Sequence, residues 1–101
     1  MKEISVEELK ARKEKGEQLN LIDVRETWEF EEFNIGAQNV PLSTFVNHLE
    51  ELQPFKEKEV IIQCKMGGRS SQAAMILDQM GFTDVKHVKG GLDEWKAKFP
   101  V

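Results

Sequence analysis

The chain is poor in the residues that build cross-linked or metal-bound folds. Its 101 residues include one cysteine and two histidines, and no tyrosine. A single cysteine cannot form a disulfide within the chain, and it cannot supply the several thiolates of a structural zinc site. We therefore expect no metal site. Redox or transfer chemistry at the cysteine would need a partner from outside the chain.

Long apolar runs and an excess of positive charge are also missing. No run approaches the roughly 18 to 20 apolar residues that cross a bilayer, and the formal net charge is −4. We expect no membrane span and no general attraction to nucleic acid. The amino end, residues 1–8, is acidic and lacks the apolar core of a signal peptide, so a cytoplasmic location is expected. The length suits one compact domain, 1–101.

The hydrophobic pattern predicts strands that alternate with helices. Short apolar segments predict strands at 4–6, 19–25, near 40, at 60–62 and at 84–88. Helical patterns lie between them, at 6–14 after a capping Ser5, 26–32, 44–52 after a capping Ser43, 70–80 and 92–99. Most connections are long enough for crossovers. The predicted fold is an α/β domain with a central, mostly parallel sheet of about five strands and helices on both faces.

The only cysteine, Cys64, follows the predicted strand at 60–62 and precedes a glycine-rich turn and a helix. The carboxyl end of a strand, just before a helix N-terminus, is where open α/β sheets bind ligands. Unpaired N–H groups and the helix dipole stabilise an anion there, and a thiolate is such an anion. The sequence thus nominates Cys64 as a nucleophile. The alternative is a small buried core residue beside a plain turn.

The turn after Cys64 has the composition of an anion-binding loop. Gly67 and Gly68 permit positive φ angles, so that successive N–H groups can converge on one point. Arg69 adds a fixed positive charge, and Ser70 can cap the next helix or contribute its hydroxyl. Met66 either forms an apolar lip over the cysteine or points outward. Such a loop suits attack on a sulfur or a phosphorus centre that carries anionic oxygens.

Four segments, in this order along nearly the whole chain, carry a resemblance to a known family. They are Leu-Ile-Asp-Val-Arg-Glu at 21–26 with an aromatic, acidic continuation, Ile-Gly-Ala-Gln-Asn-Val-Pro-Leu at 35–42, Cys-Lys-Met-Gly-Gly-Arg-Ser at 64–70, and Gly-Gly-Leu-Asp-Glu-Trp at 90–95. In these segments the chain resembles the rhodanese family of sulfurtransferases, specifically its small single-domain form.

The resemblance implies a two-step sulfur transfer without metal or cofactor. The Cys64 thiolate would take the outer sulfur of a small anionic donor such as thiosulfate. The resulting persulfide, bound by the loop from Lys65 to Ser70, would pass its sulfur to cyanide or a cellular thiol. Lys65 and Arg69 would suit an anionic donor.

Three other functions stay open at this point. The first is a sulfur-carrier or binding module that acts with a protein partner in a sulfur relay. The second is a cysteine phosphatase that uses Cys64 and Arg69, although phosphatases of the tyrosine-specific type have a longer loop between these two residues. The third is an inactive interaction domain, which the intact loop argues against.

Two further groups of residues have two interpretations each. Asp23 and Arg25 end a predicted strand, where they either line the pocket rim or brace neighbouring loops, and we favour bracing. Trp28, Phe30 and Phe33 either form an apolar wall that faces the substrate or anchor a short helix to the core, and we expect at least two of them in the core.

Overall fold

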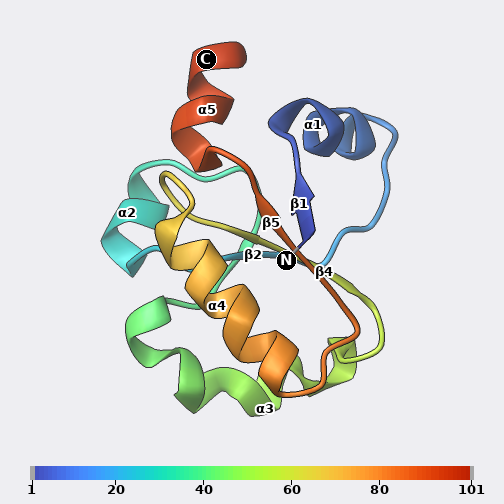
Figure 1. Ribbon diagram of the computed structural model, residues 1–101. Helices are drawn as coiled ribbons and strands as arrows, with labels where there is room; N and C mark the ends of the chain where they lie inside the picture. The colour runs from blue at the N-terminus through green and yellow to red at the C-terminus, as the bar shows by residue number, and fades with distance from the viewer. Residues whose placement is uncertain (1, 101) are drawn as a thin grey trace.

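Five strands form one parallel sheet in the computed structural model, which describes residues 2–100. Figure 1 shows the sheet strands in the middle of the fold, with helices around them. The end residues of the predicted domain, 1 and 101, lie outside the described residues. The strands are β1 (Lys2–Ile4), β2 (Leu21–Asp23), β3 (Gln38–Asn39), β4 (Glu59–Gln63) and β5 (Asp84–Val88). Their spatial order is β1-β5-β4-β2-β3, and every neighbouring pair is parallel. The predicted α/β fold class is confirmed.

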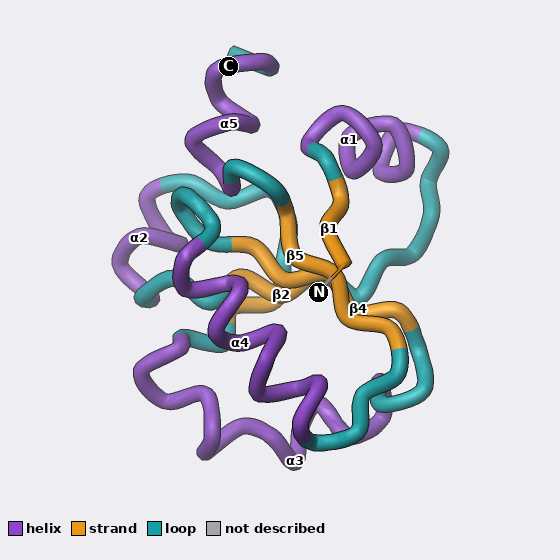
Figure 2. Tube along the Cα trace, viewed as in Figure 1, coloured by secondary structure: helices purple, strands orange, loops and turns teal. Residues whose placement is uncertain are grey.

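Helices cover both faces of the sheet, as predicted (Figure 2). One face carries α1 (Val6–Glu14) and α5 (Gly91–Lys98). The other carries α4 (Gly68–Gln79), α3 (Leu49–Leu52) and the 3₁₀ segments η1 (Leu42–His48) and η2 (Gln53–Phe55). The short α2 (Thr27–Glu32) follows the carboxyl end of β2. Within residues 2–100, no helix combines the length and apolar character needed to span a membrane.

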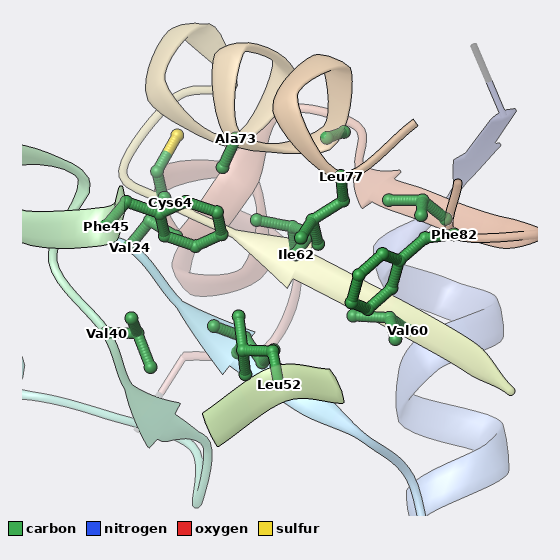
Figure 3. Packing of buried hydrophobic residues seen from close by; sticks show 13 residues of the cluster. Val24, Val40, Phe45, Leu52, Val60, Ile62, Cys64, Ala73, Leu77 and Phe82 are labelled. Atoms are coloured by element: carbon green, nitrogen blue, oxygen red, sulfur yellow. The ribbon is translucent and has the colours of Figure 1, made fainter. Parts of the chain in front are cut away.

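Strand β4 is buried on both faces and joins two separate hydrophobic clusters. Ile61 packs into the cluster on the α1 and α5 side, whereas Val60 and Ile62 pack into the cluster on the α4 side. Figure 3 shows this second cluster, in which Leu77 of α4 and Phe82 lie against the strand. Successive side chains of a strand point to opposite faces. A continuous apolar strand therefore anchors the loop that follows it on both sides.

Helix α1 begins and ends where local signals predict. The Ser5 hydroxyl accepts a hydrogen bond from the Glu8 N–H at 3.0 Å, so Ser5 is the N-cap. Gly16, with φ of +80°, ends the helix.

Two element boundaries differ from the prediction. Strand β1 lies two residues earlier than predicted, and α4 begins at Gly68 instead of at Ser70.

The predicted continuous helix at 44–52 is wrong. The segment is divided into η1, α3 and η2, and Thr44 has non-helical angles of φ −123° and ψ 17°. The Ser43 hydroxyl does not cap a helix; it donates a hydrogen bond to the Glu26 carboxylate at 2.9 Å. Pro54 lies in the first turn of η2, where proline is tolerated, so the helical segment continues past it to Phe55.

Candidate active site

Cys64 directly follows β4, and a short loop, residues 64–67, connects it to α4. Its thiol is free, and the residue is 1% exposed because its carbon skeleton belongs to the hydrophobic cluster. In Figure 3 the sulfur points away from Phe45 and Val24, toward the α4 side. No set of three or more His, Cys, Asp or Glu side chains within residues 2–100 is arranged to hold a metal ion.

Hydrogen-bond donors converge on the Cys64 sulfur. The Gly67 N–H lies 3.0 Å from Sγ and the Ser70 N–H lies 3.4 Å from it. The thiol lies 3.5 Å from the Ser70 hydroxyl, which donates to the Gly67 carbonyl oxygen at 3.1 Å. Gly67 has φ of +126°, a conformation that a residue with a side chain rarely adopts. The turn therefore presents backbone N–H groups to the sulfur as an anion-binding nest.

The two loop residues after Cys64 point away from this nest. Lys65 Nζ forms an exposed ion pair with Asp93 Oδ2 at 3.0 Å. Met66 is 68% exposed, so its side chain points outward, the second of the two orientations considered from sequence. The side chains of Lys65 and Met66 thus belong to the rim, and the backbone N–H groups of Gly67 and Ser70 contact the sulfur.

The N-terminus of α5 is hydrogen-bonded to the same loop. The Leu92 N–H donates to the Cys64 carbonyl oxygen, and the Asp93 N–H donates to the Lys65 carbonyl oxygen, both at 2.9 Å. Gly91 permits this approach, since a Cβ there would lie 2.5 Å from the Lys65 oxygen. The glycine pair at 90–91 was visible in the sequence, but its contact with the cysteine loop was not.

Arg69 makes a two-pronged ion pair with Glu29 of α2. The Nη1–Oε1 distance is 2.6 Å and the Nη2–Oε2 distance is 3.0 Å. The pKa of Glu29 is lowered to about 2, first by its hydrogen bonds from Arg69 and also by the Glu26 N–H. The pKa of Arg69 is raised, first by the hydrogen bonds to Glu29 and further by the charges of Glu29, Cys64 and Asp23. Sequence reasoning missed Glu29, although its spacing from Glu26 is that of a capping box.

Asp23 and Arg25 form a buried pair beside the loop. The Arg25 side chain donates to the Asp23 carboxylate from Nη2 at 2.8 Å and from Nε at 3.0 Å. Gln63 Nε2 also donates to this carboxylate, at 3.1 Å. The Arg25 guanidinium further donates to the backbone oxygens of Glu29 and Phe33, at 3.3 and 2.6 Å. The two residues pair with each other as well as with neighbours, and Arg25 binds α2 through the Glu29 carbonyl within the helix and the Phe33 carbonyl just after it.

A concavity of about 140 Å³ lies between α2 and α5, next to the loop. Trp28 is 63% exposed on its wall, and Phe33 alone of the three aromatics packs against a core cluster. The prediction that at least two of them are core residues is therefore wrong. The physical reason is that α2 is short and has no buried residue.

The residues that line the concavity come from α2, α5 and the segments beside them. They are Arg25, Trp28, Glu29, Glu32, Phe33, Lys65, Leu92, Asp93 and Lys96.

Comparison with known proteins identifies the family. The family model for the rhodanese-like domain matches residues 5–98. YtwF of Bacillus subtilis, named as a candidate sulfurtransferase, is 37% identical over 97% of this chain and 93% of its own length. YrkF of the same organism, named as a candidate sulfur carrier protein, is 36% identical over 95% of this chain, and the chain spans 51% of YrkF. The structure of the human single-domain sulfurtransferase TSTD1 superposes with a TM-score of 0.83, at 28% identity over 97% of each chain. The chain therefore belongs to the family of rhodanese-like domains.

Proposed function

We propose that the protein transfers sulfane sulfur from a donor such as thiosulfate to cyanide or a thiol, through a persulfide on Cys64. The observation that carries the proposal is the convergence of the Gly67 and Ser70 N–H groups on the Cys64 sulfur, at 3.0 and 3.4 Å. Donors held by the backbone stabilise negative charge on sulfur at no cost of rearrangement. A lone cysteine in this setting suits nucleophilic attack followed by release.

In the first step the Cys64 thiolate attacks the outer sulfur of the donor. A bond forms between Sγ and that sulfur while the S–S bond of thiosulfate breaks, and sulfite leaves with the electron pair. The terminal persulfide sulfur then carries the negative charge. The N-termini of α4 and α5 both meet the loop, and their dipoles favour this anion.

In the second step a thiophilic acceptor attacks the terminal sulfur. Cyanide becomes thiocyanate, or a thiolate becomes a persulfide, and the electron pair of the broken S–S bond returns to Cys64. The cycle consumes no oxidant and needs no metal or cofactor. Because Cys64 must start as a free thiolate, we place the reaction in a reducing compartment such as the cytoplasm.

A second candidate function is a sulfur-carrier module that receives and delivers sulfur only on a protein partner. Two observations favour it: the name of the relative YrkF, and exposed apolar side chains beside the loop, Trp28 and Met66. A phosphatase is less well supported, because the Arg69 guanidinium that would bind a phosphate is engaged by Glu29.

Intact-protein mass spectrometry after incubation with thiosulfate tests the proposal. The wild type should gain one sulfur atom, which cyanide removes, while the nearly isosteric Cys64→Ser variant gains none. A gain on the variant would place the chemistry elsewhere. If the wild type gains sulfur from a persulfidated protein but from no small donor, the carrier function replaces the enzymatic one. If it gains sulfur from neither and cleaves an aryl phosphate, the phosphatase function replaces both.

A further inference from the structure

Arg69, in the first turn of α4 directly after the cysteine loop, is already neutralised by a carboxylate from another helix. Arg69 precedes Ser70, whose N–H contacts the Cys64 sulfur, and the charge of Cys64 is among the causes that raise the pKa of Arg69. Both prongs of the guanidinium are nevertheless held by the Glu29 carboxylate, at 2.6 and 3.0 Å. The Glu29 side chain is 12% exposed and the Arg69 side chain 33%, so this pairing is screened less than a fully exposed ion pair.

The surroundings of the loop provide no surplus of positive charge. The concavity beside it is lined by three cationic residues, Arg25, Lys65 and Lys96, and by three acidic residues, Glu29, Glu32 and Asp93. Lys65 is paired with Asp93, and Arg25 with the buried Asp23. Attraction of a doubly charged donor needs a field of one sign. The charges that line the concavity are balanced instead.

We infer that Glu29 is a specificity-determining residue. It makes the site prefer sulfur donors with an organic substituent and a single negative charge over the thiosulfate dianion. Thiosulfonates and organic persulfides are donors of this class. The inference rests on the proposed function, since it concerns the donor of the same reaction at Cys64.

The charge of the donor matters because the nucleophile is itself an anion. A dianion that approaches the Cys64 thiolate is repelled more strongly than a monoanion, and sulfite leaves with more charge than an organic sulfinate does. A free Arg69 would offset this difference. With Glu29 in place, most of that offset is lost, and the backbone N–H groups of the nest remain as the main stabilising groups.

The test compares two donors that deliver the same sulfur atom. Thiosulfate is the dianion and benzenethiosulfonate the monoanion. With the second donor, Sγ bonds to the outer sulfur, the donor S–S bond breaks, and benzenesulfinate leaves with the electron pair. The rate of sulfur gain on Cys64 is measured for each donor in a single turnover, by quenching and intact-protein mass spectrometry.

Glu29→Gln should raise the ratio of the thiosulfate rate to the benzenethiosulfonate rate by roughly three- to tenfold, the effect of one unmasked charge near the surface. In the double variant Glu29→Gln/Arg69→Gln the ratio should return to near the wild-type value, because the Arg69 guanidinium that loss of the Glu29 carboxylate would unpair is no longer present. Glu31→Gln is the matched control: Glu31 lies exposed on the same helix α2 and has no ion pair with the described residues, so its ratio should stay unchanged.

The outcomes separate the inference from the proposed function. If Glu29→Gln slows or speeds both donors by the same factor, Glu29 only braces the loop and the inference is wrong. An equal rise of the ratio in Glu31→Gln, or its persistence in the double variant, would also overturn the inference. If the wild type gains sulfur from neither donor, the proposed function fails instead.

Discussion

The backbone N–H of Leu92 donates a hydrogen bond to the carbonyl oxygen of Cys64 at 2.9 Å. The nucleophile is therefore joined through its own backbone to the first turn of the last helix, α5. Since the Asp93 N–H binds the Lys65 oxygen in the same way, the helix fixes two consecutive peptide groups of the loop. The glycine at position 91 is what allows the two backbones to come this close.

Replacing Gly91 with alanine should disrupt this contact. Its Cβ would lie 2.5 to 2.6 Å from backbone atoms of Cys64 and Lys65, and the residue has φ of +62°. We expect Gly91→Ala to lower the free energy of unfolding by about 3 kcal/mol and to slow sulfur gain on Cys64. Gly16→Ala is the matched control, with φ of +80° and no atom near the added Cβ, and it should cost only about 1 kcal/mol. Urea denaturation of both variants checks the difference, and equal costs would contradict it.

Loss of the buried carboxylate of Asp23 should destabilise the fold strongly. Asp23 is 0% exposed and neutralises the Arg25 guanidinium, which also donates to the Phe33 oxygen of the α2 end. Asp23→Asn keeps the shape but leaves a buried cation without a counter-charge, so we expect a loss of about 3 kcal/mol in unfolding free energy. Asp93→Asn, in the exposed pair with Lys65, should change it by less than about 1 kcal/mol. Similar unfolding midpoints in urea for the two variants would show that Asp23 does not brace the loop.

Acid should weaken the fold through Glu59, at the start of β4. The pKa of Glu59 is lowered to about 2, first by hydrogen bonds from Arg12 of α1 and also by Lys86 of β5. A carboxyl group with a lowered pKa stabilises the fold fully above its ordinary value, near 4.5, and this stability is lost as the pH falls from there to about 2.

Glu59→Gln tests this dependence. The variant should lose about 2 kcal/mol of unfolding free energy at pH 7, after allowance for partial exposure, and should then fall less steeply than wild type between pH 4.5 and 2. Glu57→Gln, at an exposed position two residues away, should follow the wild-type curve. Urea midpoints measured across this pH range decide the matter, and parallel curves for Glu59→Gln and wild type would refute the assignment.

Local signals were sufficient for much of the fold. Strand β5 covers residues 84–88 as predicted, since a β-branched pattern between turn residues needs no distant partner to be recognised. The cap at Ser5 and the stop at Gly16 are likewise encoded within a few residues. The position of Cys64 between β4 and α4 follows from the same kind of local pattern.

Distant contacts account for what the sequence did not predict. Glu29 and Arg69 are 40 residues apart, and the pattern around Arg69 gives no sign that a carboxylate occupies its guanidinium. Ser43 looked like a helix cap, but its hydroxyl donates a hydrogen bond to the carboxylate of Glu26, in a distant segment of the chain. Trp28 looked like a core anchor, yet it is 63% exposed on the short helix α2, which buries none of its residues. Each of these three arrangements depends on where distant segments lie in the folded protein, and the hydrophobic periodicity of the sequence does not predict those positions.

The Ser70 hydroxyl should contribute to the reactivity of Cys64. It is fully buried and lies 3.5 Å from the sulfur, where it accepts from the thiol and donates to the Gly67 carbonyl oxygen; once the thiol loses its proton, rotation of the hydroxyl turns its own proton toward the thiolate. Ser70→Ala removes this group but keeps the Ser70 N–H, so single-turnover sulfur gain from benzenethiosulfonate should slow by roughly three- to tenfold. Ser71→Ala is the matched control, because the Ser71 hydroxyl makes an equivalent bond to the Gly68 oxygen on the exposed side of the same helix. A rate for Ser70→Ala equal to that of Ser71→Ala would mean that the backbone N–H groups alone stabilise the charge on sulfur.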